Sequence, residues 1–126
     1  MTFTESVSVC FKKYFVFQGR ASRSEYWWFQ LIVAPAYLIF EITESESSPV
    51  SYLFLVITIL TLIPAISAVV RRLHDTNKSG FYLLLGLIPF IGGLILLFFL
   101  ITDGTKGKNK YGENPLVKKR SQKKKK

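Results

Sequence analysis

The clearest pattern along the chain is a pair of uninterrupted apolar runs, residues 50–70 and 81–101, joined by a short polar segment. Each run is 21 residues long and contains no Asp, Glu, Lys, Arg or His. A transmembrane helix needs about 20 such residues to cross roughly 30 Å of hydrocarbon. The pattern therefore predicts two membrane-spanning helices, connected at one face of the bilayer by the polar segment 71–80, here called the elbow.

A third and weaker apolar run precedes these two, over about residues 26–42, with Gln30 inside it. It reaches the length of a membrane span only when the aromatic residues at its start are counted. Tyr26, Trp27 and Trp28 are therefore interpreted as an aromatic belt, with their rings at the membrane–water interface. We expect this run to be the first of three crossings.

The N-terminal segment has a different periodicity. Phe3, Val7, Phe11 and Phe15 recur at intervals of four over residues 2–17, which predicts a short amphipathic helix with one aromatic side. Two interpretations are equally supported: the helix lies in the headgroup plane before the first crossing, or it packs on the rest of the protein.

Together these runs predict an all-α membrane protein: a small bundle of three transmembrane helices preceded by a short amphipathic interfacial helix. The predicted organisation is a single integral membrane domain over residues 1–115, with spans at about 26–42, 50–70 and 81–101, followed by a disordered basic tail over residues 116–126.

Each predicted span contains a proline near its middle: Pro35, Pro64 and Pro89. Proline removes a helical hydrogen bond and kinks the helix, which membrane helices tolerate when neighbouring groups satisfy the freed carbonyl. Gly92 and Gly93 closely follow Pro89, so the third run is the one most expected to bend or break.

Composition supports membrane placement. Of 126 residues, 49% are hydrophobic, and the net charge is +9. In a membrane protein, such a positive charge favours Lys and Arg residues that are held on the cytoplasmic side near anionic lipids. Binding to nucleic acid is the less favoured explanation of the charge. Cys10 is the only cysteine, so no intramolecular disulfide can form, and packing is favoured over reactivity for this thiol.

The distribution of basic residues conflicts with a third crossing, because loops rich in Lys and Arg tend to stay on the cytoplasmic side of the membrane. Four basic residues precede the first span, none lies in the first loop, three lie in the elbow and ten follow residue 101. Two crossings place the N-terminus and the elbow together on the cytoplasmic side, but a third places the tail outside. We favour three crossings on hydrophobic length; a bent hairpin around residues 89–93 would instead bring the tail back inside.

Antiparallel crossing also brings charged residues together at one membrane face. The start of the first span and the elbow form a candidate interfacial charge cluster, made up of Arg20, Arg23, Glu25, Arg71, Arg72, His74 and Asp75. Charges partly removed from water are favourable when paired and costly when single. We therefore expect Glu25 to pair with Arg71 or Arg72, and Asp75 to pair with Arg20 or Arg23.

The polar motifs resemble those of a bacterial membrane family known as domain of unknown function 805, the YhaH-like inner-membrane proteins. The resemblance extends over roughly residues 11–115. The matching pieces are residues 19–27 (GRASRSEYW), 71–76 (RRLHDT) with 78–80 (KSG), Ile88-Pro89 with Ile91-Gly92, and Gly104 through Gly107 with Asn109, Tyr111-Gly112 and Pro115. It implies a multi-pass protein of the bacterial inner membrane and brings no catalytic residue.

Three functional interpretations stay open. The favoured one is a non-enzymatic protein that acts through a membrane-protein partner, a second copy or anionic lipids at its charged face. The second is a small oligomeric transporter or channel component. The third is a lipid-modifying enzyme centred on His74 and Asp75, in which the histidine acts as a general base. One histidine and one cysteine cannot form a typical metal site, so we expect neither a metal nor another cofactor.

Overall fold

The computed structural model describes residues 2–46 and 48–116, and within these ranges the regular elements are helices. An isolated β-bridge between Asn109 and Gly112 is the one extended pairing there. Most of the predicted basic tail, residues 117–126, lies outside the described residues. In chain order the elements are α1 (Phe3–Lys12), α2 (Arg23–Thr43), η1 (Glu44–Glu46), α3 (Pro49–Asp75), η2 (Gly80–Leu87) and α4 (Ile91–Ile101). The prediction of an all-helical protein is confirmed for this part of the chain.

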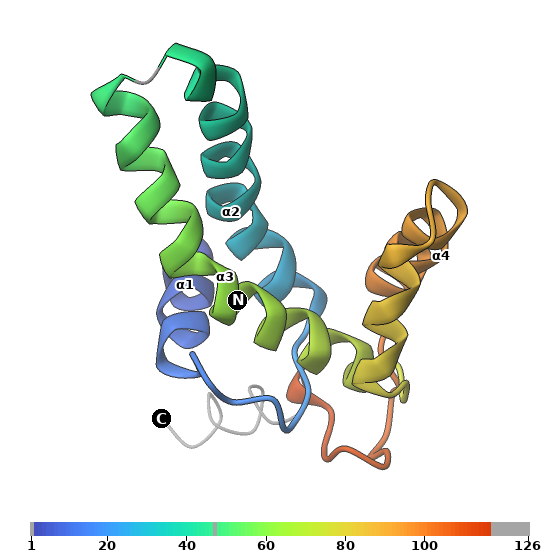
Figure 1. The fold of residues 1–126 in the computed structure, drawn as a ribbon. Coiled ribbons are helices and arrows are strands. Elements are labelled where there is room, and N and C mark those ends of the chain that lie inside the picture. Colours follow the sequence, from blue (N-terminus) through green and yellow to red (C-terminus); the bar gives the residue numbers. More distant parts are fainter. Residues whose placement is uncertain (1, 47, 117–126) are drawn as a thin grey trace.

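The two long helices, α2 and α3, form an antiparallel hairpin that ends in the short helix η1 (Figure 1). Local sequence sets both N-termini: Glu25 N donates to Ser22 Oγ at 3.3 Å, and Ser51 N donates to Ser48 Oγ at 3.3 Å. These side-chain caps satisfy amide groups that have no partner within the first helical turn. Pro49 begins α3, where its missing N–H costs nothing.

Among the described helices, α3 is the one that is long and apolar enough to cross a membrane, judged by length and composition. Its 27 residues correspond to about 40 Å at 1.5 Å per residue. The 21 residues of α2 correspond to about 31 Å, but this helix is less apolar. The predicted first and second spans, 26–42 and 50–70, therefore lie within continuous helices, and three transmembrane helices are not confirmed.

The predicted third span, residues 81–101, is not one helix. The chain rises along η2, reverses at Pro89 and Phe90, and returns along α4, so the run forms a second hairpin beside the first (Figure 1). Phe90 has φ 62°, a left-handed conformation that turns the chain sharply. Each arm is about 16 Å long, roughly half the hydrocarbon thickness. The bent hairpin, the alternative to a full crossing, is the arrangement found.

Close packing of the two arms depends on Gly92. A Cβ atom at this position would lie 1.8 Å from the carbonyl oxygen of Leu85 and 2.7 Å from Cβ of Ile88. Only a residue without a side chain fits such an approach between two backbones. At Gly93, by contrast, a Cβ atom would meet nothing within 4 Å.

The prolines divide into two kinds. Pro35 lies inside α2 and Pro64 lies inside α3, as predicted for interruptions of a span. Pro89 lies in the turn between η2 and α4 instead of within a helix, so its predicted role as a mid-span kink is corrected. The ribbon of α3 changes direction in its second half, which leads the helix toward the loops at the base of the molecule (Figure 1).

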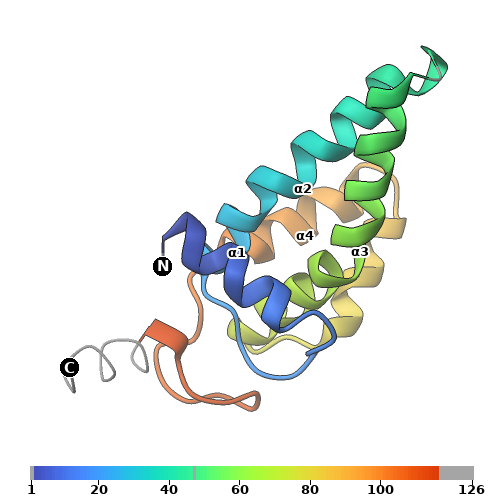
Figure 2. The same ribbon diagram turned by 90° about the vertical axis from the view of Figure 1, so that its left-hand side faces the viewer.

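The N-terminal helix α1 packs against the lower ends of α2 and α3 (Figure 2). Ser6 and Cys10 are its buried residues, and the hydroxyl of Ser6 donates to the carbonyl of Glu25. Just beyond the helix, Tyr14 Oη donates to the carbonyl of Leu60 at 2.8 Å, and Ser67 Oγ donates to the carbonyl of Lys13 at 3.3 Å. Packing on the bundle, one of the two interpretations of this segment, is therefore observed.

The core lies where α1, α2 and α3 meet, near the loops. Phe29, Ala68 and Leu73 are completely buried there, together with Cys10. Tyr26 belongs to this core, with 6% of its surface exposed, and Trp27 packs against it. The predicted aromatic belt is thus corrected for Tyr26, because that ring faces neighbouring helices and not the outside.

Candidate functional site

Three polar segments meet at one end of the molecule, which we call the polar end: residues 13–22, the elbow 71–80 and the C-terminal loop 102–116 (Figures 1 and 2). The η2–α4 hairpin returns the chain to this end and thereby delivers the C-terminal loop to it. Backbone hydrogen bonds join all three segments. Ala21 N donates to the carbonyl of Arg71 at 2.9 Å, and Thr105 N donates to the carbonyl of Asp75 at 2.8 Å.

Arg20 makes the largest set of contacts across these segments. Its Nε lies 2.8 Å from Oδ1 of Asp75, and only 1% of the arginine side chain is exposed. Nη1 donates to the carbonyls of Gly107 and Gly112 at 2.9 and 3.2 Å, while Nη2 donates to the carbonyls of Thr105 and Asp75. The planar guanidinium presents its donors in a fixed fork, so one side chain holds the C-terminal loop against the end of α3.

Arg72 binds the other oxygen of Asp75 and also reaches the end of α4. Its Nη1 contacts Oδ2 of Asp75 and donates to the carbonyl of Ala21 at 3.3 Å. Nε donates to the carbonyl of Leu100 at 2.9 Å, and Nη2 donates to the carbonyl of Thr102. Burial lowers the pKa of Arg72 from its ordinary value, opposed by the nearby Asp75 carboxylate. Carbonyl dipoles thus help to stabilise two guanidinium groups around one carboxylate.

A second buried ion pair joins α2 to α3. Nη1 of Arg71 contacts Oε2 of Glu25, with 0% and 5% of the two side chains exposed. The remaining Arg71 nitrogens, Nε and Nη2, are buried and have no hydrogen-bond partner in the described structure. Neutralising Glu25 would therefore leave a buried cation without its carboxylate partner in the described part of the chain, which is costly in a low-dielectric interior.

His74 takes a structural position between two loops. Its ring stacks on Tyr111, with the centroids 3.9 Å apart and the planes at 1°, and its Nδ1 lies 2.9 Å from the carbonyl oxygen of Gly19. Asn109 Nδ2 donates to the His74 carbonyl at 2.9 Å. Burial lowers the pKa of His74, opposed by the hydrogen bond to Gly19. His74 lies in the last turn of α3, after the apolar part of that helix and at the polar end of the molecule.

Gly104 explains how the C-terminal loop approaches Asp75 so closely. A Cβ atom on Gly104 would lie 2.0 Å from Oδ2 of Asp75, a separation that no side chain can occupy. The loop backbone therefore packs directly on the carboxylate that binds Arg20 and Arg72.

The residues of the predicted charge cluster do not all behave alike. Two of the buried pairs, Glu25–Arg71 and Asp75–Arg20, are among those that antiparallel crossing predicted. Arg72 binds Asp75 and not Glu25. Arg23 instead pairs with Asp103 at 2.6 Å, and the side chains are 54% and 78% exposed, so solvent screens this contact. The sequence reasoning did not identify the loop carbonyls that surround Arg20, or the stack of Tyr111 on His74. Carbonyl groups carry no side-chain signal, whereas Asn109 and Tyr111 belong to the motifs that carry the family resemblance, and that membership is the signal that could have pointed to them.

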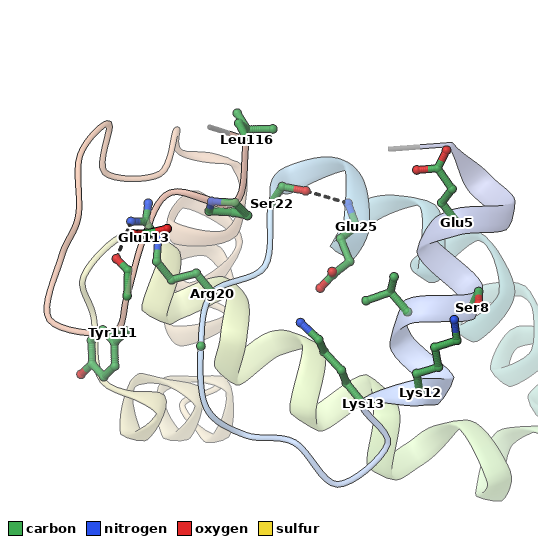
Figure 3. Close-up of a pocket in the computed structure, with 14 residues that line it drawn as sticks. Glu5, Ser8, Lys12, Lys13, Arg20, Ser22, Glu25, Tyr111, Glu113 and Leu116 are labelled. Carbon is green, nitrogen blue, oxygen red and sulfur yellow. Dashed lines mark hydrogen bonds between the residues drawn. The ribbon is translucent and has the colours of Figure 1, made fainter. Parts of the chain in front are cut away.

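A pocket of about 740 Å³ opens beside this network, between α1, the segment 19–25 and the end of the C-terminal loop (Figure 3). Lys12, Lys13 and Arg20 are the basic residues that line it. Glu5, Glu25 and Glu113 are the acidic ones. Among the described residues, no group of three or more His, Cys, Asp or Glu side chains is arranged to hold a metal ion.

The helical hairpins, with apolar outer surfaces and a buried polar network at one end, have the features of a membrane protein. Comparison with known proteins agrees and assigns the family. The chain matches the proteins of unknown function DUF805 over residues 14–113, and it belongs to this family. It is 43% identical over 105 residues to the inner membrane protein YhaI of Escherichia coli strain K12, covering 82% of this chain and 89% of that protein.

A second relative is the inner membrane protein YhaH of the same strain, 37% identical over 109 residues, covering 82% of this chain and 90% of that protein. No solved structure matches the chain. The expected family is thus confirmed, and the names of these relatives support placement of this protein in a bacterial inner membrane. They carry no reaction, substrate or partner.

Proposed function

We propose that this protein crosses the inner membrane twice, through α2 and α3, and that it acts without catalysis, by binding anionic lipids at its polar end. The observation that carries the proposal is the meeting of three polar segments around the buried Arg20–Asp75 and Arg71–Glu25 pairs. Such a network fixes the shape of a charged surface that would otherwise be a set of independent loops.

The proposed topology rests on the lengths and charges of the two hairpins. The tip of the α2–α3 hairpin, formed by the end of α2 and by η1, carries Glu41 and Glu44 and no basic residue. Exposed carboxylates at this tip are unfavourable inside hydrocarbon. The tip therefore lies in water on the far side of the membrane. The η2–α4 hairpin is only about half as long as the hydrocarbon is thick, so it enters and leaves by the same face.

Charge then sets the orientation. Lysine and arginine of the described chain occur at the polar end and are absent from the α2–α3 connection. Loops rich in Lys and Arg stay on the cytoplasmic side, where anionic headgroups attract them. A hairpin in place of a third crossing removes the conflict between hydrophobic length and the distribution of positive charge.

The contacts of His74 and Asp75 favour binding over catalysis. Nδ1 of His74 is engaged by the Gly19 carbonyl, and the ring is covered on one face by Tyr111. Both oxygens of Asp75 bind guanidinium groups. A catalytic His–Asp dyad would need the Asp75 carboxylate to orient the His74 ring, but here both Asp75 oxygens bind guanidinium groups and Nδ1 of His74 faces the Gly19 carbonyl. In this arrangement the two residues hold the loops together.

Lipid selectivity tests the proposal. The purified protein in mild detergent is titrated with phosphatidylglycerol or phosphatidylcholine, and bound lipids are counted by native mass spectrometry. We expect preferential retention of phosphatidylglycerol that weakens as salt rises, because the attraction is between charges. Equal retention of the two lipids would contradict lipid binding by charge. A changed headgroup composition on overexpression, abolished by His74→Ala, would instead support the lipid-modifying enzyme.

A further inference from the structure

We propose that the pocket between α1 and the C-terminal loop is a specific site for the phosphate of an anionic phospholipid, bound by Lys12 and Lys13. This inference rests on the proposed function and assigns one defined site to it. The rest of the polar end would attract anionic lipids through its net positive charge, without a defined binding site.

The pocket has a suitable size and position. Its volume of about 740 Å³ lies within the range of roughly 300–1,000 Å³ typical of small-molecule sites. Lys12 and Lys13, at the end of α1, line one wall, while Arg20 and Glu113 line the opposite wall (Figure 3). An entering group would thus be held between a helix and a loop that the buried network fixes in place.

The basic residues of the pocket differ in whether their charge is already compensated. Arg20 is buried and paired with Asp75, so it cannot serve an incoming anion without losing that contact. Neither Lys12 nor Lys13 forms a salt bridge with a described residue. Lys12 and Lys13 are consecutive residues that line the pocket without a salt bridge to a described carboxylate, and phosphate oxygens accept charge-assisted hydrogen bonds from ammonium groups.

The acidic residues of the pocket determine where that phosphate lies. The charge of Glu25 is compensated by Arg71, with which it forms a buried ion pair. Glu5 and Glu113 are exposed, so water screens their repulsion. An anion therefore lies at the Lys12–Lys13 wall, away from Glu113. Removal of the Glu113 charge would strengthen binding of an anion, whereas it would weaken binding of a cation or a headgroup amine.

The surroundings identify a lipid as the source of the phosphate. The side chains of Phe3 and Phe11 are each 41% exposed, and that of Phe15 is 75% exposed. Phe3 also contacts the exposed Trp28 edge to face, with the ring centroids 6.1 Å apart. Large aromatic groups exposed on α1 and just after it fit an interfacial position, which would place the pocket at headgroup level.

The test compares two pairs of lysines with the same charge loss. Lys12→Gln/Lys13→Gln removes the proposed ligands, and Lys106→Gln/Lys108→Gln removes two exposed lysines of the C-terminal loop that do not line the pocket. Phosphatidylglycerol is titrated into each detergent-solubilised protein and bound lipid is counted by native mass spectrometry. We expect the affinity for the first bound lipid to fall about tenfold in the first variant and less than twofold in the second. Circular dichroism checks that both remain folded.

Additional arms distinguish the sources of phosphate and separate this inference from the proposed function. Glu113→Gln should strengthen lipid binding, and a weakened affinity would overturn the anionic headgroup as ligand. Millimolar inorganic phosphate should not displace the lipid; displacement would identify free phosphate as the ligand. Equal losses of lipid affinity in the two lysine variants, with selectivity for phosphatidylglycerol retained, would overturn the pocket as the binding site and leave the proposed function standing. Absence of selectivity in the unmodified protein would overturn the proposed function as well.

Discussion

Arg20 and Asp75 form a buried ion pair across 55 residues of sequence, with 2.8 Å between Nε and Oδ1. The pair joins the segment before α2 to the last residue of α3, and the same guanidinium binds carbonyls of the C-terminal loop. One side chain therefore connects the two hairpins at the end where they meet. This connection depends on a planar group with several donors, not on charge alone.

Arg20→Lys tests that dependence. Lysine keeps the charge but cannot donate to Asp75 and to the loop carbonyls together, so we expect a loss of about 2 kcal/mol in the free energy of unfolding. SDS titration in mixed micelles, followed by circular dichroism, measures it. Arg23→Lys is the matched control, because its pair with Asp103 is exposed and is expected to change stability by less than about 0.5 kcal/mol. Equal effects in the two variants would show that the geometry around Arg20 is unimportant.

Glu25→Gln tests the second buried pair. The substitution leaves Arg71 buried without a countercharge, and we expect a loss of about 3–5 kcal/mol, seen as reduced protein in the membrane fraction. Adding Arg71→Met removes the uncompensated cation, so the double variant should recover at least half of the lost protein. Glu44→Gln, at an exposed site, is the control. A double variant worse than Glu25→Gln would argue against charge compensation as the reason for the pair.

Gly92→Ala tests the hairpin formed by η2 and α4. The added Cβ would overlap the Leu85 carbonyl, so the backbones must separate, at a cost of about 1–3 kcal/mol. Gly93→Ala meets no atom within 4 Å and places a better helix former in α4, so it should be neutral or stabilising. Thermal unfolding in detergent compares the two. If residues 81–101 formed one straight helix, the two substitutions would have similar effects.

Cys10 should be unreactive in the folded protein. Burial chiefly raises the pKa of its thiol from 9.0 to about 11, so at pH 8 the thiolate is about 100-fold scarcer than in an unfolded chain. We expect negligible labelling by N-ethylmaleimide in detergent and rapid labelling after denaturation. Ser8→Cys in a Cys10→Ser background places a thiol on the exposed side of α1 and should label readily without denaturation. Rapid labelling of native Cys10 would contradict its packing against α2.

Much of this arrangement follows from the sequence, and the exceptions have physical causes. Two consecutive crossings run in opposite directions through the membrane, and this places residues 20–25 beside the elbow. Charge pairing between these two segments was therefore predictable from topology alone. Hydrophobic length does not distinguish a crossing helix from a hairpin of two half-length arms, and the turn at Phe90 requires a positive φ that phenylalanine rarely adopts. The signal that favoured the hairpin was the number of basic residues after residue 101.

The contacts of the C-terminal loop were less predictable. Carbonyl groups are present in every residue, so the sequence does not reveal which of them an arginine will bind. Gly104 has a readable role only once Asp75 is known to lie against it. The aromatic-belt prediction is wrong for Tyr26 because position near a helix start does not specify which side of the helix faces the core.

The location of the C-terminus tests the central claim, that three polar segments meet at one membrane face. Paired fusions after Lys126 to a fluorescent protein that folds only in the cytoplasm and to a phosphatase active only outside it report the side directly. We predict bright fluorescence and no phosphatase activity, because the η2–α4 hairpin returns the chain to the face that holds the elbow. Phosphatase activity without fluorescence would mean that residues 81–101 cross the membrane, and it would contradict the meeting of the C-terminal loop with Arg20 and Asp75.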